Sequence, residues 1–192
     1  DRLFTLRTVE DTLKIREFIE QHHPRSAVLA GGGFIGVELM ENLRELGIDV
    51  TVVQRPRQLL NPLDADMAAF LHAKLRQKGV RLHLGCTVEG FAANGDRVNV
   101  LLKDEAPLTA DMVVLAIGVT PDTGLAKAAG LELGIKGSIL VNDRMETSAP
   151  DIYAVGDAVQ VKHFVTGQDT LLSLAGPANK QGRIAADNIC GG

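Results

Sequence analysis

The segment 30–38, Ala-Gly-Gly-Gly-Phe-Ile-Gly-Val-Glu, has glycines at the spacing of a phosphate-binding turn. Gly31, Gly33 and Gly36 match the pattern GxGxxG. The first glycine permits a tight turn, the second lets the backbone approach a pyrophosphate, and the third lets a helix pack on a strand. The helix that follows would offer free N–H groups and the positive end of its dipole. The alternative is a flexible loop beside a packing glycine.

A second ligand contact is predicted about 20 residues further on, where such turns are normally followed by an acid that binds the ribose 2′-hydroxyl of NAD. Here Gln54 is followed by Arg55, Pro56 and Arg57. An amide does not repel a phosphate, and arginine can pair with one bidentately. Such a charged bond contributes about 1.5–3 kcal/mol, or about a tenfold to hundredfold preference. This favours the 2′-phosphate of NADP(H), the alternative being that Arg55 and Arg57 are solvated surface charges.

The elements around these residues alternate between helix and strand. Thr8 and Asp11 form a predicted capping box that begins a helix. Short apolar runs bounded by glycine predict buried strands, and longer runs with helical spacing predict helices. The expected order is helix 8–23, strand 26–31, helix 34–47 with Gly47 at its C-terminal cap, strand 49–53 and helix 64–78.

The rest of the chain continues the alternation after an antiparallel insertion. The apolar period changes towards two over 81–102, and Asn94-Gly95 predicts a hairpin turn. We then expect a buried strand at 110–118, a short helix at 122–130, a strand at 151–158 and a closing helix at 176–189. Strands alternating with helices predict an α/β fold with a mostly parallel sheet, with helices or a meander on either face.

Composition excludes several other classes of protein. The net charge is −4, aromatic residues make up 4% and tryptophan is absent, which argues against nucleic-acid binding. No apolar run reaches the roughly 18 residues of a membrane span, and the charged N-terminal segment lacks a signal-peptide core. The two cysteines, Cys86 and Cys190, are far apart and the five histidines lack ligand spacing. We therefore predict no metal, no membrane association and a reducing, cytoplasmic location.

Four motifs carry a resemblance to a known family: GGGFIGVE, AIGVTPDT, IYAVGDAV and LAGPANKQGRIAADN. The whole chain resembles the pyridine nucleotide–disulfide oxidoreductases, in the branch of coenzyme A-disulfide reductases, NADH oxidases and NADH peroxidases. The resemblance implies a Rossmann-like FAD/NAD(P)-binding three-layer ββα fold with a short antiparallel meander. It makes 1–118 the NAD(P)-binding domain and 119–192 an incomplete, returning segment of the FAD-binding domain.

The resemblance also assigns roles by position. It places Ile35 and Glu38 near the nicotinamide and Gly118 beside the nucleotide, and Asp157 on the ribityl hydroxyls of FAD. Leu174 and Ala175 would meet the edge of the flavin ring. The alternatives are that Asp157 caps a helix, that Glu38 is a first-turn residue favoured by the helix dipole, and that Gly118 only ends a strand. The predicted cofactor-binding set is Gly31, Gly33, Phe34, Ile35, Gly36, Glu38, Gln54, Arg55, Gly118, Asp157, Leu174 and Ala175.

The resemblance implies several parts that this chain lacks. We therefore expect the chain to be an internal fragment of a longer protein. The glycine-rich FAD turn, the redox cysteine and a dimerisation domain would lie outside it, and neither Cys86 nor Cys190 matches the redox cysteine. The implied parent is a homodimer that passes hydride from NAD(P)H to FAD and then reduces a disulfide, such as coenzyme A disulfide, oxygen or peroxide. The alternatives are a non-catalytic nucleotide-binding module and a reductase of ferredoxin-type proteins.

Overall fold

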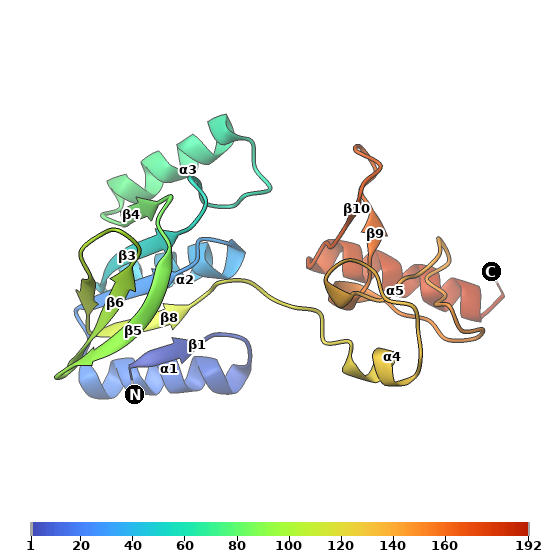
Figure 1. The fold of residues 1–192 in the computed structure, drawn as a ribbon, viewed down its shortest axis with the longest axis horizontal. Coiled ribbons are helices and arrows are strands. Elements are labelled where there is room, and N and C mark those ends of the chain that lie inside the picture. Colours follow the sequence, from blue (N-terminus) through green and yellow to red (C-terminus); the bar gives the residue numbers. More distant parts are fainter. Residues whose placement is uncertain (1, 192) are drawn as a thin grey trace. The chain divides into compact units, whose positions relative to one another are not determined.

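The structure is a computed structural model that describes residues 2–191, so Asp1 and Gly192, the ends of the two predicted domains, lie outside the described residues. The chain divides into two compact units, Asp1–Gly118 and Val119–Gly192. They are called the first unit and the second unit, and each is described by itself. Figure 1 labels their helices and strands along the chain.

The first unit is built on a parallel sheet of five strands. Its strand order is β1-β8-β2-β3-β4, and every neighbouring pair is parallel. β2 therefore lies at the centre, between β8 and β3. The bounds are β1 Leu3–Thr5, β2 Ser26–Ala30, β3 Asp49–Gln54, β4 Arg81–Leu84 and β8 Met112–Leu115.

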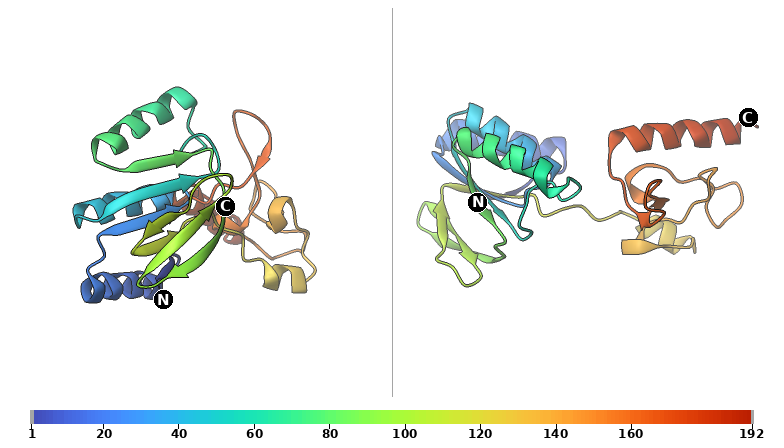
Figure 2. Two further views of the ribbon diagram at one scale, coloured as in Figure 1. Left: turned by 60° about the vertical axis from the view of Figure 1, so that its left-hand side comes forward. Right: turned by 90° about the horizontal axis from the view of Figure 1, so that it is seen from above.

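Three helices cover one face of this sheet, as the view from above in Figure 2 shows. They are α1 Val9–His22, α2 Phe34–Glu45 and α3 Ala65–Gln77. At the start of α1 the Asp11 N–H donates to the Thr8 side chain at 3.2 Å, and the Thr8 N–H donates back to the Asp11 carboxylate at 3.2 Å. The capping box predicted for this helix is thus present.

A three-stranded antiparallel meander covers the opposite face. Its strands are β5 Val88–Asn94, β6 Arg97–Leu102 and β7 Leu108–Ala110, in the order β5-β6-β7. The hairpin turn is Gly95-Asp96, because Asn94 pairs with Arg97 and still belongs to β5. The prediction of Asn94-Gly95 was one residue early, since Gly95, with φ +56°, is the first turn residue instead of the second.

Side-chain alternation along the central strands produces two separate apolar clusters. Ala27 and Leu29 of β2 belong to the cluster under the helices, which includes Met40 and Leu43 of α2. Val28 belongs to the cluster under the meander, with Val53, Cys86, Val98, Val100 and Val113. Because successive strand residues point to opposite faces, strands buried on both faces read as continuous apolar runs. The three-layer ββα arrangement is confirmed.

The second unit contains short elements and one long helix. Its bounds are α4 Gly124–Ala128, η1 Ile135–Gly137, η2 Gly156–Ala158, β9 Val161–Lys162, β10 Asp169–Thr170 and α5 Ala175–Ile189, with β9 and β10 antiparallel. The predicted strand at 151–158 was wrong. Tyr153 makes only an isolated bridge to Glu146 within the described residues, and the segment then turns into η2. A strand requires a continuous ladder, which this segment does not find.

Two further features differ from or limit the sequence predictions. The strand expected over 110–118 is divided, because Ala110 ends β7 in the meander and Met112 begins β8 in the parallel sheet. Separately, none of the helices that the structure describes combines the length and the apolar content needed to cross a membrane.

Candidate functional site

The glycine turn follows central strand β2, and its first glycine is held against the backbone after β8. Gly31 has φ +112°, and its N–H donates to the Val53 carbonyl at 2.9 Å. A Cβ at this position would come within 2.2 Å of the Ala116 carbonyl oxygen. Both the backbone conformation and the lack of space therefore require glycine.

The other two fingerprint glycines have contrasting surroundings. A Cβ on Gly36 would lie 2.3 Å from the Gly31 carbonyl oxygen, so glycine is what lets α2 pack onto the turn. A Cβ on Gly33 would meet no described atom within 4 Å, and Gly33 is exposed. Gly33 therefore leaves open space above the turn, as the approach of a ligand to the backbone requires.

The start of α2 is arranged to receive an anion. Gly33 is its N-cap, no side chain among residues 2–191 caps it, and no acidic residue lies in its first turn. Unpaired N–H groups and the positive end of the helix dipole attract negative charge. Phe34 and Ile35 present apolar side chains that are 47% and 37% exposed. Glu38 is exposed and lies beyond the first turn, which removes the interpretation of it as a first-turn residue.

Gln54 lies at the end of β3, and its side chain contacts the backbone of the glycine turn and of the segment that follows β3. Its Oε1 accepts from the Gly32 N–H at 2.9 Å, and its Nε2 lies 3.5 Å from the Gln58 carbonyl oxygen. The Gln54 amide thus ties the glycine turn to the residues after β3. The adjacent arginines are different: Arg55 and Arg57 are exposed, and neither forms an ion pair with another described residue.

The segment 55–63, called the 55–63 loop, is fixed beneath the glycine turn by contacts that the sequence analysis missed. The Leu60 N–H donates to the Gly32 carbonyl at 2.9 Å, and the Leu59 N–H donates to Nε2 of His72 on α3 at 3.0 Å. Leu59 is fully buried, and a Cβ on Gly32 would lie 2.1 Å from its Cδ2. Gly32 occupies a position where the GxGxxG pattern accepts any residue, so a glycine there was the one sequence feature that could have indicated this close packing.

The strand end after β8 lies beside the turn. The Ala116 N–H donates to the Ala30 carbonyl at 2.7 Å, and Ile117 is 77% exposed. Gly118 follows with φ +117° and is the last residue of the first unit. The structure thereby brings together Gly31, Gly36 and the residues that lead into Gly118.

The predicted residues of the second unit lie at a turn and at the start of α5. Asp157 is exposed within η2, whose N-cap is Val155, so Asp157 does not cap that helix. The buried Gln181 of α5 accepts from the Gly156 N–H at 2.7 Å, which joins this turn to α5. Leu174 is the N-cap of α5 and Ala175 its first residue; both are exposed, and no described side chain caps the helix.

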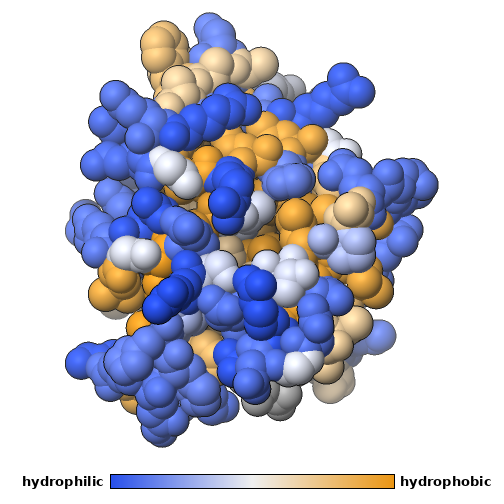
Figure 3. Space-filling model, turned by 90° about the vertical axis from the view of Figure 1, so that its left-hand side faces the viewer, coloured by the Kyte–Doolittle hydropathy of each residue, from blue (hydrophilic) through white to orange (hydrophobic). Residues whose placement is uncertain are grey.

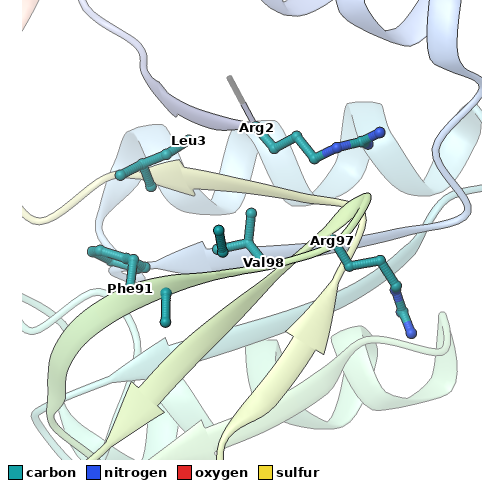
Figure 4. A pocket seen from close by; sticks show the side chains of 8 residues that line it. Arg2, Leu3, Phe91, Arg97 and Val98 are labelled. Atoms are coloured by element: carbon teal, nitrogen blue, oxygen red, sulfur yellow. The ribbon is translucent and has the colours of Figure 1, made fainter.

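Neither cysteine belongs to the predicted set of site residues, although the backbone N–H of Cys86 donates to the Gln54 carbonyl at 3.1 Å. Cys86 is buried in the meander-side cluster, where burial first and Glu105 second raise the pKa of its thiol, whereas Cys190 is exposed. Residues 2–191 contain no group of three His, Cys, Asp or Glu placed to hold a metal. A hollow of about 320 Å³ is lined by Arg2, Leu3, Phe91, Ala92, Ala93, Gly95, Arg97 and Val98 and includes no predicted site residue (Figure 4).

The surface on the side of the meander and β4 is mixed in character. Figure 3 shows apolar areas between numerous hydrophilic side chains on this face. The hollow in Figure 4 shares that character, because Leu3, Phe91 and Val98 form its apolar part and two arginines its polar part. Its arginines are already occupied: Arg97 pairs with Asp111 at 3.1 Å, and Arg2 donates to the Asp111 carbonyl at 3.1 Å.

Comparison with known proteins identifies the class of this fold and then its family. A glycine turn between a central parallel strand and an uncapped helix is the nucleotide-binding arrangement of Rossmann-like folds. The profile of the family described as pyridine nucleotide-disulphide oxidoreductase matches residues 1–182. The chain belongs to this family.

Three relatives illustrate the likeness. A protein named NADH oxidase from Methanocaldococcus jannaschii is 38% identical over 192 residues, which is 100% of this chain and 42% of that protein. The crystal structure of reduced Bacillus anthracis CoADR-RHD is 49% identical with a TM-score of 0.93, covering 100% of this chain and 34% of that one. The chain therefore spans about two fifths of the length of the curated relative.

The third relative is an engineered, water-forming NADPH oxidase bound to NADPH, made from the NADH oxidase of Lactobacillus brevis. It is 29% identical with a TM-score of 0.90, covering 98% of this chain and 41% of that one. Its five substitutions include aspartate to alanine and, at the next position, alanine to arginine.

Proposed function

We propose that the first unit binds NAD(P)H and that the second unit supplies part of an FAD site, in a flavoprotein oxidoreductase longer than this chain. The observation that carries this proposal is the open, uncapped turn at Gly33 between β2 and α2. Family membership supports the same assignment. When bound, NAD(P)H supplies a hydride that FAD accepts, and the chain's own residues bind and orient the two groups.

In the first unit, the pyrophosphate is held by N–H groups at Gly33 and the start of α2. The fit is supported by Gly31 and Gly36, whose missing side chains let backbone segments pack closely and leave the helix end accessible. The exposed apolar side chains of Phe34 and Ile35 suit the face of a nicotinamide ring. On the strength of the family resemblance, Glu38 joins Ile35 near the nicotinamide and the backbone at Gly118 lies beside the nucleotide.

In the second unit, the exposed Asp157 carboxylate accepts hydrogen bonds from sugar-chain hydroxyls of FAD, as carboxylates commonly do. Leu174 and Ala175 lie at the uncapped N-terminus of α5, which would meet the edge of the flavin ring. The positive end of that helix stabilises negative charge on the flavin. Gln181 supports this arrangement, because it holds the turn that carries Asp157 against α5.

The coenzyme of the first unit is proposed to be NADP(H) in preference to NAD(H). Gln54 is neutral and its oxygen is engaged by the Gly32 N–H, so Gln54 holds the loop and Arg55 meets the 2′-phosphate. Arg55 is exposed and has no carboxylate partner among the described residues. The engineered NADPH oxidase has the same combination of a neutral residue followed by an arginine where its sequence was changed.

Electrons then pass to a small-molecule acceptor through a cysteine outside this chain. The proposed acceptors are oxygen, peroxide, or a disulfide such as coenzyme A disulfide. The name NADH oxidase of the Methanocaldococcus relative supports oxygen. The burial of Cys86 and the raised pKa of its thiol argue against a redox role for it. The parent is proposed to be a cytoplasmic homodimer that does not bind nucleic acid, in line with its charge and few cysteines.

Calorimetric titration with NADPH and NADH tests this proposal. We expect NADPH to bind at least about tenfold more tightly, since a charged hydrogen bond supplies that much. Arg55→Ala should remove the difference, whereas Arg16→Ala, which removes an exposed arginine of α1, should leave it unchanged. Equal binding of the two coenzymes would disprove the NADPH preference, and no binding of either would disprove the nucleotide site.

A further inference from the structure

The 55–63 loop is held in one conformation by bonds at its inner side. The Leu60 N–H bonds the Gly32 carbonyl, and Leu59 is buried beneath Gly32. Leu60 has φ +47°, a left-handed backbone that is unfavourable for a residue with a branched side chain. Such a conformation persists only when its surroundings impose it, and it is found often in ligand-binding segments.

His72 of α3 supplies one of the contacts that fix the conformation of this loop. Its Nε2 receives the Leu59 N–H at 3.0 Å and therefore acts as an acceptor. Only an imidazole with an unprotonated Nε2 can accept, because both nitrogens of the charged ring carry hydrogen. Burial first, and the positive charge of Arg76 second, lower the pKa of His72, so the accepting form prevails at neutral pH.

We propose that His72 is a positioning residue for coenzyme selection: its neutral ring holds the 55–63 loop through Leu59, and the loop in turn holds Arg55 at the 2′-phosphate. Protonation of His72 would break the bond to Leu59 and loosen the loop at that point, while the Leu60 bond to Gly32 would remain and the glycine turn would keep its hold on the pyrophosphate. The inference rests on the proposed function, which supplies the nucleotide and the Arg55 contact. It assigns to α3 a role in specificity without contact to the ligand.

Among the charged groups near His72, the positive charge of Arg76 favours the neutral ring. The 55–63 loop and α3 carry both cations and carboxylates, and β4, which packs on α3, carries two further basic side chains. Arg81 donates to the Thr51 hydroxyl, and His83 pairs with Glu105 at 3.6 Å. The titratable groups of these elements are Arg55 and Arg57 of the loop, Asp64 before α3, Asp66, Lys74 and Arg76 of α3, and Arg81 and His83 of β4.

The sign of the pH effect follows from the direction of this pKa shift. Because the folded pKa is lowered, the loop bond is fully present above the ordinary histidine value of about 6.5. It is lost as pH falls through the lower, folded pKa. The preference for NADPH over NADH is therefore expected to weaken in acid. The 2′-phosphate itself gains a proton near pH 6, so the wild type alone cannot separate the two effects.

The test compares His72→Ala and His72→Gln with the wild type in the full chain, using calorimetric dissociation constants for NADPH and NADH. At pH 7.5, His72→Ala should lower the NADPH preference about threefold to tenfold, the worth of one hydrogen bond, and leave NADH binding nearly unchanged. His72→Gln keeps an acceptor near the Nε2 position and should retain the preference. His83→Gln, in β4, is the matched histidine control and should behave as the wild type.

The pH series supplies an independent measurement that does not depend on the alanine variant folding. Once the pH has fallen from 7.5 through the lowered pKa of folded His72, the wild type should have lost about threefold more of its NADPH preference than His72→Gln, which cannot be protonated. Identical losses in the two proteins would overturn the inference, as would an equal weakening of NADPH and NADH by His72→Ala. If instead Arg55→Ala leaves the preference of the wild type intact, the proposed coenzyme contact fails, whatever His72 does.

Discussion

The two units differ in how their candidate binding residues are supported. In the first unit, the glycine turn follows the central strand of a five-stranded sheet that is buried on both faces by two apolar clusters. In the second unit, β9 and β10 have two residues each, and Leu125, Phe164 and Val165 are 87%, 102% and 83% exposed. Binding geometry in the first unit therefore rests on backbone ladders and packing.

The second unit relies instead on side chains that bond to backbone. Gln181 accepts from Gly156, Gln160 accepts from the Ile135 N–H at 2.8 Å, and the Thr123 hydroxyl donates to the Gly137 carbonyl at 2.6 Å. Each such bond contributes about 0.5–1.5 kcal/mol, whereas a buried leucine contributes more through its packing. The comparison predicts that stability of the first unit depends on apolar volume and that of the second on individual polar contacts.

The largest expected effect comes from opening a cavity in the first unit. Leu29 of β2 is fully buried, so Leu29→Ala should lower the free energy of unfolding by about 2–5 kcal/mol. Leu125→Ala, the same change at an exposed position of α4, should alter it by less than about 0.5 kcal/mol. Urea unfolding followed by circular dichroism measures both, and hydrogen exchange assigns the loss to residues 1–118. Similar losses in the two variants would contradict the proposed contrast.

The next effect separates packing from ligand access within the glycine turn. Gly36→Ala places a methyl group against the Gly31 carbonyl and should cost about 1–3 kcal/mol. Gly33→Ala enters open space at φ −77°, so the fold should keep its stability while NAD(P)H binds about tenfold more weakly. Thermal unfolding and calorimetry distinguish the two results. Unchanged coenzyme affinity in Gly33→Ala would show that the ligand does not approach this backbone.

The same contrast explains which features could be predicted from the sequence. Local signals were sufficient in the first unit: the Thr8 capping box is present, and the glycine turn, with Gly31 at positive φ, lies between a strand and a helix as expected. The error at 151–158 has a non-local cause, because an apolar run becomes a strand only when a neighbouring strand supplies its ladder. Tyr153 finds a single bridge partner in the described chain.

The sequence suggested residues for the candidate site but did not indicate the contacts that connect them. The sequence showed that Gln54 stands where nucleotide-binding folds normally have an acid. It did not indicate that the Gln54 amide would turn towards Gly32. The bond from Leu59 to His72 joins residues 13 positions apart and belongs to no motif. Such contacts depend on how α3 packs beside the 55–63 loop, which local patterns do not encode. The cofactor-binding roles of the predicted residues in both units stay predictions, since they concern a bound nucleotide and a bound flavin.

The smallest of the expected changes tests the second unit through one polar contact. Gln181 is buried, and its Oε1 accepts from the Gly156 N–H at 2.7 Å, so Gln181→Leu leaves that donor without an acceptor and should cost about 1–2 kcal/mol. Lys180→Leu, at the exposed neighbouring position of α5, is the control and should be neutral. Hydrogen exchange at Gly156 should accelerate in Gln181→Leu, while exchange in β2 and β3 should not. If leucine at position 181 instead stabilised the protein, apolar packing and not the polar contact would hold η2 to α5, and the second unit would be supported in the same way as the first.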